Sequence, residues 1–288
     1  MKAIIGILWH PLSLAWRRRE YLIHQHSTIW KEDGFDVRHF RNPKDANRVC
    51  DLVIVHSDVS CIDPAWLSPL ENHKLVLNRH VVNIRKTQVS DLILTQDSNW
   101  NGPVVIKTDL NNNGKPERWV LDREGFKRGG LNPFHEHYSF LNSISEVPQS
   151  IWRNPNYVVE QFQKEPWGDD FATTSATIFG DEVSSVKLGG KDWEVKGKKA
   201  TNWERIPTVP DEVIQKQKSL GLDYGKIDFT QNAGGIHIFD INKTIGRITL
   251  HSEHESNGRR LTKSRLRSRG QVILRYLEGE ITPFVLEK

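Results

Sequence analysis

The sequence predicts an α/β protein with α+β character, in which a small parallel-sheet domain precedes a larger region of mainly antiparallel strands. Two observations support this. Residues 1–85 alternate short apolar runs with stretches of helical length, the pattern of parallel strands joined by helices. From Val104 onward, several apolar runs are separated only by short turns, the pattern of hairpins. The 288 residues, 37% of them hydrophobic, are enough for one large or several small cores.

In the N-terminal domain, strands are expected over residues 3–9, 35–40, 51–57 and 74–78. A helix-like segment running through Trp30 joins the first two. Breaks are expected at Asp33–Gly34 and at Asn42–Pro43. We place the boundary of this domain at residue 85.

The remainder is predicted as two lobes, residues 86–155 and 156–288. Expected elements, in order, are a helix over 82–94, two strands around an Asn/Gly loop at 110–115, a strand at 157–163, a hairpin turning at Gly180–Asp181, a Lys/Gly-rich loop at 189–199, a helix over 210–220 and a hairpin over 223–246 turning at 232–235.

The last hairpin, DYGKIDFTQNAGGIHIFDINKTIG, carries the most informative polar residues. Residues two apart on a strand share a face, so Asp240 and Asn242 project side by side. If the strands pair, Asp228 comes close to them across the ladder. Two carboxylates and an amide oxygen form a site suited to Mg²⁺ carrying nucleotide phosphates.

An alternative is that these residues only cap a turn or solvate a sheet edge. The apolar residues around them, such as Ile227, Phe229 and Ile241, argue against it, because carboxylates among core residues are costly unless paired or metal-bound.

Three further features precede this hairpin. Lys107 ends an apolar strand before an Asn/Gly loop, where backbone amides and a lysine could surround phosphate. Lys86 opens the expected helix, and Glu160 follows two buried valines on the strand YVVEQFQ. Lys226 shares a strand face with Asp228.

In order and spacing, Lys86, VVIKTD, YVVEQFQ and GKID…FDIN resemble ATP-grasp enzymes over roughly residues 80–246. The ending resembles the R-x-D…E-x-N signature of the D-alanine–D-alanine ligase and glutamate-ligase branches, with Lys226 in place of arginine and Asp240 in place of glutamate. The resemblance implies an N-terminal pre-ATP domain and a two-lobed nucleotide-binding region. It implies these roles: Mg²⁺ ligands Asp228, Asp240 and Asn242; phosphate contacts Lys86 and Lys107; adenine contacts Glu160 and Phe162; ribose contact Asp169 or Asp170.

The function that this resemblance implies is an ATP-dependent carboxylate–amine ligase using two Mg²⁺ ions, with small-molecule or peptide substrates. Lys226 and Lys187 would stabilise the anionic acyl-phosphate intermediate. Arg17–Arg19 could hold a substrate carboxylate, or could form a surface helix face. An alternative is a kinase that phosphorylates a hydroxyl group.

Composition limits the remaining possibilities. No apolar run approaches the length of a membrane span, and two cysteines suggest no disulfide framework, so we expect a cytoplasmic protein with no membrane partner. A homo-oligomer is left open. The net charge is +4, and basic residues crowd the segment Arg259–Arg269. This segment keeps open a nucleic-acid-binding or acidic-partner-binding module, which the ordered motifs make less favoured.

Histidines and tryptophans add little. His135–His137 and His251–Glu255 lack the spacing of a helical metal motif, so we assign them no metal. Trp9, Trp16, Trp193 and Trp203 lie near the expected loops and could line a substrate pocket.

Overall fold

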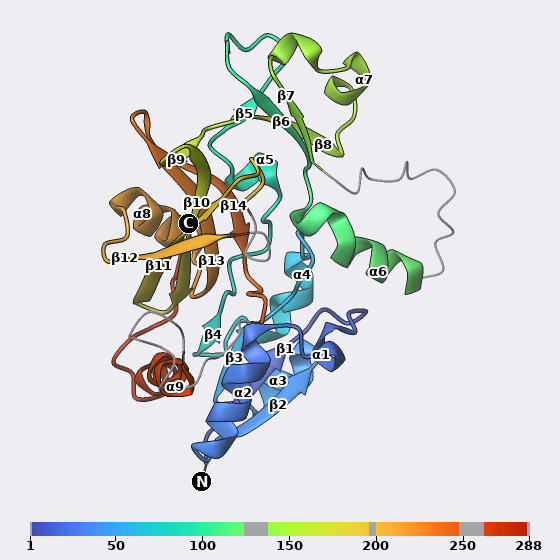
Figure 1. The fold of residues 1–288 in the computed structure, drawn as a ribbon. Helices are drawn as coiled ribbons and strands as arrows, with labels where there is room; N and C mark the ends of the chain where they lie inside the picture. Colours follow the sequence, from blue (N-terminus) through green and yellow to red (C-terminus); the bar gives the residue numbers. More distant parts are fainter. Residues whose placement is uncertain (1, 124–137, 196–199, 248–261, 287–288) are drawn as a thin grey trace.

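The computed structural model describes residues 2–123, 138–195, 200–247 and 262–286, and contains three sheets. Figure 1 shows the N-terminal sheet at the bottom, a small sheet at the top and a larger sheet beside them. The mixed architecture predicted from the sequence is confirmed. No helix in the described ranges is both long and apolar enough to span a membrane.

The N-terminal sheet is parallel, as predicted from the sequence, and its four strands have the order β2-β1-β3-β4. Alternate residues of its central strands enter two separate cores: Ile5 and Ile54 face one, Val53 and Val55 the other. Helix α2 covers the first face and α3 the second. The bounds are β1 Ile4–Leu8, β2 Asp36–Phe40, β3 Leu52–Val55, β4 Val76–Leu77, α2 Leu22–Glu32 and α3 Pro43–Val49.

Helix α3 begins at the predicted Asn42–Pro43 break. The Asn42 side chain accepts a hydrogen bond from the Lys44 amide at 3.0 Å, and Pro43 occupies the first helical position, where its missing N–H costs nothing. The other short helices of this part are α1 (Ala15–Arg18), α4 (Pro64–Leu67) and η1 (Ser68–Leu70).

The second sheet is antiparallel, in the order β5-β8-β6-β7, and has a core of its own around Val104, Ile106 and Val159. Its strands are β5 Ile93–Leu94, β6 Val104–Thr108, β7 Ser139–Leu141 and β8 Tyr157–Gln161; its helices are α5 Lys86–Val89, η2 Asn111–Gly114, α6 Lys115–Arg123, η3 Ile144–Glu146 and α7 Gln149–Trp152.

Two predictions in this region are wrong. The expected helix over 82–94 is only the single turn α5, because Ser90 is extended and Ile93–Leu94 pair with β8 instead. The strand expected after the Asn/Gly loop is helix α6. Pro116 explains this outcome, since proline suits the first turn of a helix but cannot donate to a sheet ladder.

The third sheet has the order β12-β11-β10-β13-β14, with β9 also paired to β10. Both predicted hairpins and the helix over 210–220 are confirmed. The exposed edge strand β12 and the short β9 were not predicted. The elements are β9 Glu165–Trp167, β10 Asp170–Phe179, β11 Glu182–Gly190, β12 Asn202–Ile206, α8 Asp211–Leu220, β13 Tyr224–Asn232 and β14 Gly235–Asn242.

The C-terminal helices α9 (Lys263–Gly270) and α10 (Val272–Leu277) join the third sheet to the N-terminal sheet. Leu266 and Ile273 share one core with Ile5, Phe179 and Tyr224. Gly180, at the β10–β11 turn, has φ +59°, and a Cβ there would lie 2.9 Å from Val272. Only glycine therefore fits both the turn and the close approach of α10.

Asp223 ties three parts of the chain together. Its carboxylate accepts hydrogen bonds from the backbone amides of Asn78 (2.8 Å) and Phe284 (3.0 Å) and from the Tyr276 hydroxyl (3.3 Å). Burial raises the pKa of Asp223 to about 6, although these hydrogen bonds act in the opposite direction.

This raised pKa predicts a pH-dependent stability. Between about pH 4 and pH 6 the folded protein holds a proton that the unfolded chain releases, so the contribution of Asp223 to the free energy of unfolding falls as the pH rises. A shift of roughly two pKa units corresponds to about 3 kcal/mol. Urea unfolding from pH 4.5 to 7 should show wild type losing about 2 kcal/mol more stability than Asp223→Asn, because part of the effect is already lost at pH 4.5. Parallel pH profiles of the two proteins would contradict the assignment.

Candidate functional site

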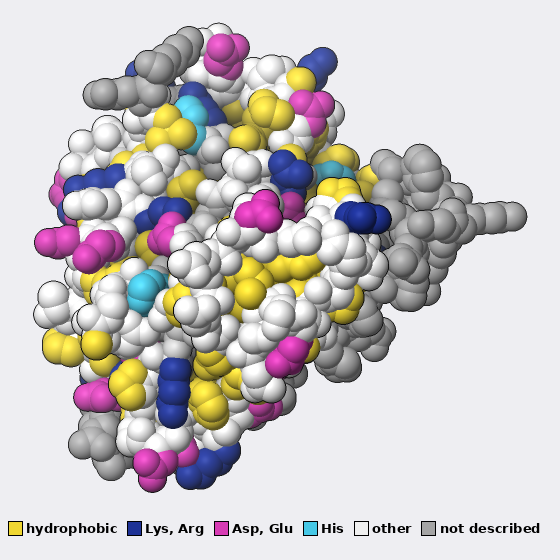
Figure 2. All heavy atoms as spheres, turned by 90° about the horizontal axis from the view of Figure 1, so that it is seen from above, with side chains coloured by type: hydrophobic (Ala, Val, Ile, Leu, Met, Phe, Trp, Pro, Cys, Tyr) yellow, Lys and Arg dark blue, Asp and Glu magenta, His cyan; other side chains and the backbone are white. Residues whose placement is uncertain are grey.

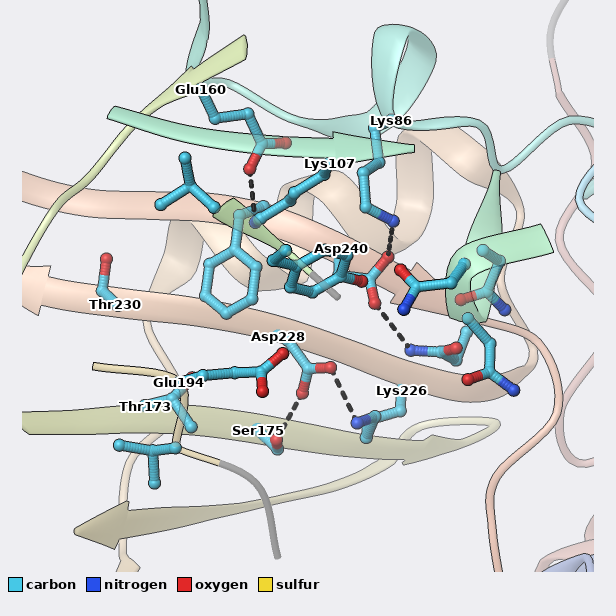
Figure 3. A pocket seen from close by; sticks show the side chains of 18 of the residues that line it. Lys86, Lys107, Glu160, Thr173, Ser175, Glu194, Lys226, Asp228, Thr230 and Asp240 are labelled. Atoms are coloured by element: carbon cyan, nitrogen blue, oxygen red, sulfur yellow. Dashed lines mark hydrogen bonds and ion pairs between the residues drawn. The ribbon is translucent and has the colours of Figure 1, made fainter. Parts of the chain in front are cut away.

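A cavity of about 430 Å³ lies where the second and third sheets meet residues of the N-terminal domain. This volume is in the range of small-molecule sites. Figure 3 shows Lys107 and Glu160 on one side of it, and Ser175, Asp228 and Thr230 on the other.

An acidic row (Asp228, Asp240 and Asn242) lies at the centre of the cavity. Asp228 is directly opposite Asp240 in the β13–β14 ladder, and the Asn242 amide donates to the Asp240 carboxylate at 3.3 Å. The predicted grouping of these three side chains is confirmed. Ser175, opposite Asp228 on β10, donates its hydroxyl to that carboxylate.

Three lysines pair with carboxylates around this row. Lys226 lies 2.7 Å from Asp228, Lys86 lies 3.2 Å from Asp240, and Lys107 pairs with Glu160. Lys86, Lys107 and Glu160, widely spaced in the sequence, are thus brought to one cavity, as expected. Glu160 meets Lys107 there, an ion pair that the sequence analysis did not foresee.

The carboxylates of the acidic row and the neighbouring lysines favour the ionised state of one another. Burial alone would raise the pKa of Asp240, but Lys86, Lys226 and Lys107 outweigh it and lower that pKa. Burial would lower the pKa of Lys86, but the neighbouring Asp240, Tyr138 and Glu160 raise it above its usual value. The cavity therefore presents fixed ammonium and carboxylate groups at neutral pH.

One end of the cavity, the aromatic end, is lined by Phe162 and Trp193. The Phe162 ring packs edge-on to Phe140 and Trp193, with centroids 5.1 Å and 6.3 Å away, and against Phe171 at 6.0 Å. Such a surface can hold a flat apolar ring. Of the four tryptophans considered from the sequence, Trp193 lines the cavity, Trp9 is wholly buried and Trp203 lies on the exposed edge strand β12.

A hydroxyl row (Thr173 and Thr230) lies between the aromatic end and the acidic row. The register that pairs Thr174 with Phe229 places Thr173 beside Thr230. Both hydroxyls are buried without a hydrogen-bond partner in the described part of the chain. The sequence analysis missed them. The signal was available, because Thr230, Asp228 and Lys226 follow one another at the two-residue period of a strand face.

Two predicted site residues lie outside the cavity. Lys187 pairs with Glu165 at 3.0 Å, and because its neighbour Leu188 lines the cavity, Lys187 belongs to the opposite face of β11. Asp170 starts β10 and pairs at 2.6 Å with the exposed Lys191. Neither residue is brought to the acidic row.

The other end of the cavity, the N-terminal end, is lined by Tyr21, Asp58, Thr244 and Gly246. The chain leaving β14 runs beside the start of α2, where Gly246 bridges to Tyr21. The side chains of Arg17 and Arg19 are not among those that line the cavity; Arg17 is exposed and lies over the Trp16 ring.

The described part of the basic C-terminal segment packs against the protein. Lys263 and Arg267 pair with Glu32 at 2.8 and 2.7 Å, and Arg269 is bonded to Ser184 and to the Thr177 carbonyl. On the face shown in Figure 2, basic and acidic side chains are interspersed. These basic side chains thus make contacts within the protein, between α9 and the elements it packs against. Arg259 and Arg260 lie outside the described residues.

Both histidine motifs, His135–His137 and His251–Glu255, also lie outside the described residues. Within the described residues, no group of three or more histidine, cysteine or acidic side chains is arranged to hold a metal ion.

No family model matches the chain, and no curated protein matches it. Among solved structures, the ATP-grasp ligase PsnB complexed with a minimal precursor is 14% identical, with a TM-score of 0.52 over 95% of this chain and 99% of that one. D-alanine–D-alanine ligase from Bacillus anthracis is 15% identical, with a TM-score of 0.47 over 96% and 99% of the two chains.

The likeness to PsnB extends over nearly the whole of both chains, and the protein therefore has the ATP-grasp fold. The ATP-grasp fold that the sequence motifs implied by resemblance is thus confirmed.

Proposed function

We propose that this protein is an ATP- and Mg²⁺-dependent ligase that joins a carboxylate to an amine. The observation that carries the proposal is the order of groups along one cavity. The aromatic end is followed by the hydroxyl row, the acidic row with its lysines, and then the N-terminal end.

This order matches the parts of ATP. The adenine ring would pack at Phe162 and Trp193, and the ribose hydroxyls would meet Thr173 and Thr230. The phosphates would then reach Lys86 and the acidic row. Lys107 and Glu160 lie on the lobe above them (Figure 3). The terminal phosphate would point to the N-terminal end. The acceptor, which is the substrate that takes the phosphoryl group, would bind there.

The acidic row fits Mg²⁺ bound together with phosphate. Mg²⁺ in such sites takes one or two protein carboxylates and completes its shell with phosphate oxygens and water. Asp228, Asp240 and Asn242 supply that donor set, and lysine ammonium groups already lie against both carboxylates. When bound, one or two Mg²⁺ ions would neutralise charge on the transferred phosphoryl group.

The residues of the cavity would act by position and charge. Lys86 and Lys107 would orient the phosphates while a substrate carboxylate attacks the terminal phosphorus and displaces ADP. Lys226, which occupies the place of the family's arginine, would stabilise the resulting acyl-phosphate. An amine would then attack the carbonyl carbon and expel phosphate, leaving an amide and releasing one proton. Lys187, which faces away from the cavity, has no part in this proposal.

The test is release of ADP and phosphate from Mg-ATP with pooled small-molecule and peptide carboxylates and amines. A ligase should release phosphate only when a carboxylate and an amine are both present. A kinase would instead release ADP when a substrate with a hydroxyl group is present. It would release no free phosphate, because the phosphoryl group stays on the product.

The lysines provide matched variants for this assay. Lys107→Met should lower ADP release by about 100-fold, because a charge that stabilises the transition state is removed, whereas Lys187→Met should change it less than about threefold. Failure of the wild type to bind Mg-ATP would overturn the proposal. Equal effects of the two substitutions on ADP release would show that Lys107 is not part of the catalytic site.

A further inference from the structure

Asp58, at the N-terminal end of the cavity, is a buried carboxylate with a free oxygen. The residue is only 2% exposed, yet it is one of those that line the cavity. Oδ2 accepts hydrogen bonds from the Tyr21 hydroxyl at 3.3 Å and from the Ser13 hydroxyl at 3.4 Å. Oδ1 has no hydrogen-bond partner in the described part of the chain. A buried carboxylate oxygen without a donor is costly, so a ligand that donates there would be favoured.

The nearby cations are engaged elsewhere. The ion pairs of the three cavity lysines are made with Asp240, Glu160 and Asp228, not with Asp58. Lys243 is completely buried, and its ammonium group donates to the Val81 carbonyl at 3.1 Å. Asp58 thus gives this end of the cavity a buried carboxyl group with one oxygen that no donor in the described part of the chain engages.

The location of Asp58 sets its role. Tyr21 holds Oδ2 and bridges to Gly246, in the segment that follows the acidic row along the chain. Asp58 therefore lies at one end of the cavity, and Phe162 and Trp193 lie at the other. A nucleotide with its base at Phe162 would leave the Asp58 end for the second substrate. From the sequence, Arg17–Arg19 could have held a substrate carboxylate or formed a surface helix face; the charged group found at this end is the acid Asp58.

We propose that Asp58 is a substrate-binding residue that receives a primary ammonium group of the acceptor, which is thus an amino acid, a peptide or another amine-bearing molecule. Tyr21, by donating to Oδ2, positions the carboxylate and leaves Oδ1 for the ligand. The inference rests on the proposed ATP-dependent function and narrows its substrate class.

The probe is a panel of common amino acids and short peptides, each compared with its N-acetyl derivative, in the presence of Mg²⁺ and a non-hydrolysable ATP analogue. Acetylation removes the ammonium charge and leaves the rest of each molecule in place. Free compounds that bind should raise Tm by about 3 °C at ten times their Kd, and their acetylated forms should not. This comparison uses wild-type protein and does not depend on a variant that folds.

Asp58→Asn keeps the size of the side chain and removes its charge. It should weaken binding of the free compounds by about 10- to 100-fold while leaving the affinity for the ATP analogue within about twofold, since a charge-assisted hydrogen bond is lost only at the acceptor. The control is Asp97→Asn, an exposed carboxylate outside the cavity lining, which should bind like wild type.

The outcomes separate this inference from the function on which it rests. Loss of ATP-analogue binding in wild type would overturn the proposed function. Normal ATP-analogue binding with equal responses to free and acetylated compounds, or with no response to any free compound, would overturn the role of Asp58 alone. Unchanged binding of the free compounds by a folded Asp58→Asn would do the same.

Discussion

Replacing Asp240 by asparagine is expected to lower ATP turnover by at least about 100-fold. Asp240 pairs with Lys86, accepts a hydrogen bond from Asn242 and faces Asp228 across the ladder, so it lies beside both other members of the acidic row. The substitution keeps the shape but removes one of the two carboxylate charges that would hold Mg²⁺. ADP release should be measured over a range of Mg²⁺ concentrations, and the variant should need more Mg²⁺ than wild type.

The matched control is Asp181→Asn, which removes an exposed carboxylate that lies at the β10–β11 turn, outside the cavity lining, and pairs with Arg275 at 2.8 Å. It should retain wild-type turnover. Because Asp240→Asn also leaves the nearly buried Lys86 without its carboxylate partner, the Tm of each variant must be recorded at the same time. Turnover by folded Asp240→Asn within about threefold of wild type, with the same Mg²⁺ dependence, would exclude Asp240 from the proposed metal site.

Replacing Trp30 by alanine is expected to cost about 4 kcal/mol of stability, the second large effect. The Trp30 side chain is 1% exposed, stacks on His26 with ring centroids 5.4 Å apart, and meets the edge of Phe179 at 6.1 Å. Its indole N–H donates to the Gly270 carbonyl at 3.0 Å, which ties α2 to the end of α9. Truncation would open a cavity and leave that carbonyl without its donor.

Chemical unfolding at 25 °C would measure this effect. Trp203→Ala is the control, because Trp203 lies on the edge strand β12 and is 38% exposed. Its loss should cost less than about 1 kcal/mol. Similar losses of stability for the two variants would show that Trp30 does not join α2 to α9 in the way that the contacts indicate.

The acidic row could be predicted only in part from the sequence, although one hairpin contains all three side chains. Strand periodicity places Asp240 and Asn242 on one face. The register of the turn alone would pair Asp228 with Phe239, and a shift of one residue between Asp228 and Phe229 brings Asp228 opposite Asp240 instead. The parallel N-terminal sheet was predictable because its buried strands and intervening helices alternate along the chain.

The N-terminal end of the cavity could not be predicted in the same way. Asp58 follows β3, Tyr21 precedes α2, and Gly246 comes after β14, so only the path of the chain after β14 brings them together. Lys187 illustrates another limit: its chemistry suited the site, but a shift of one residue along β11 decides which face it occupies. The apolar neighbour Leu188 was the available clue.

The walls of the cavity rest on different hydrophobic cores. The N-terminal sheet, the ends of β10 and β13 and the C-terminal helices share one core, and Val89 of α5 belongs to the core of the third sheet. The small sheet around Val104 has a core of its own. Parts with separate cores are expected to shift relative to one another more readily than parts that share one. A shift of the small sheet would change the distance from Lys107 to a ligand while leaving Lys86 and Asp240 paired.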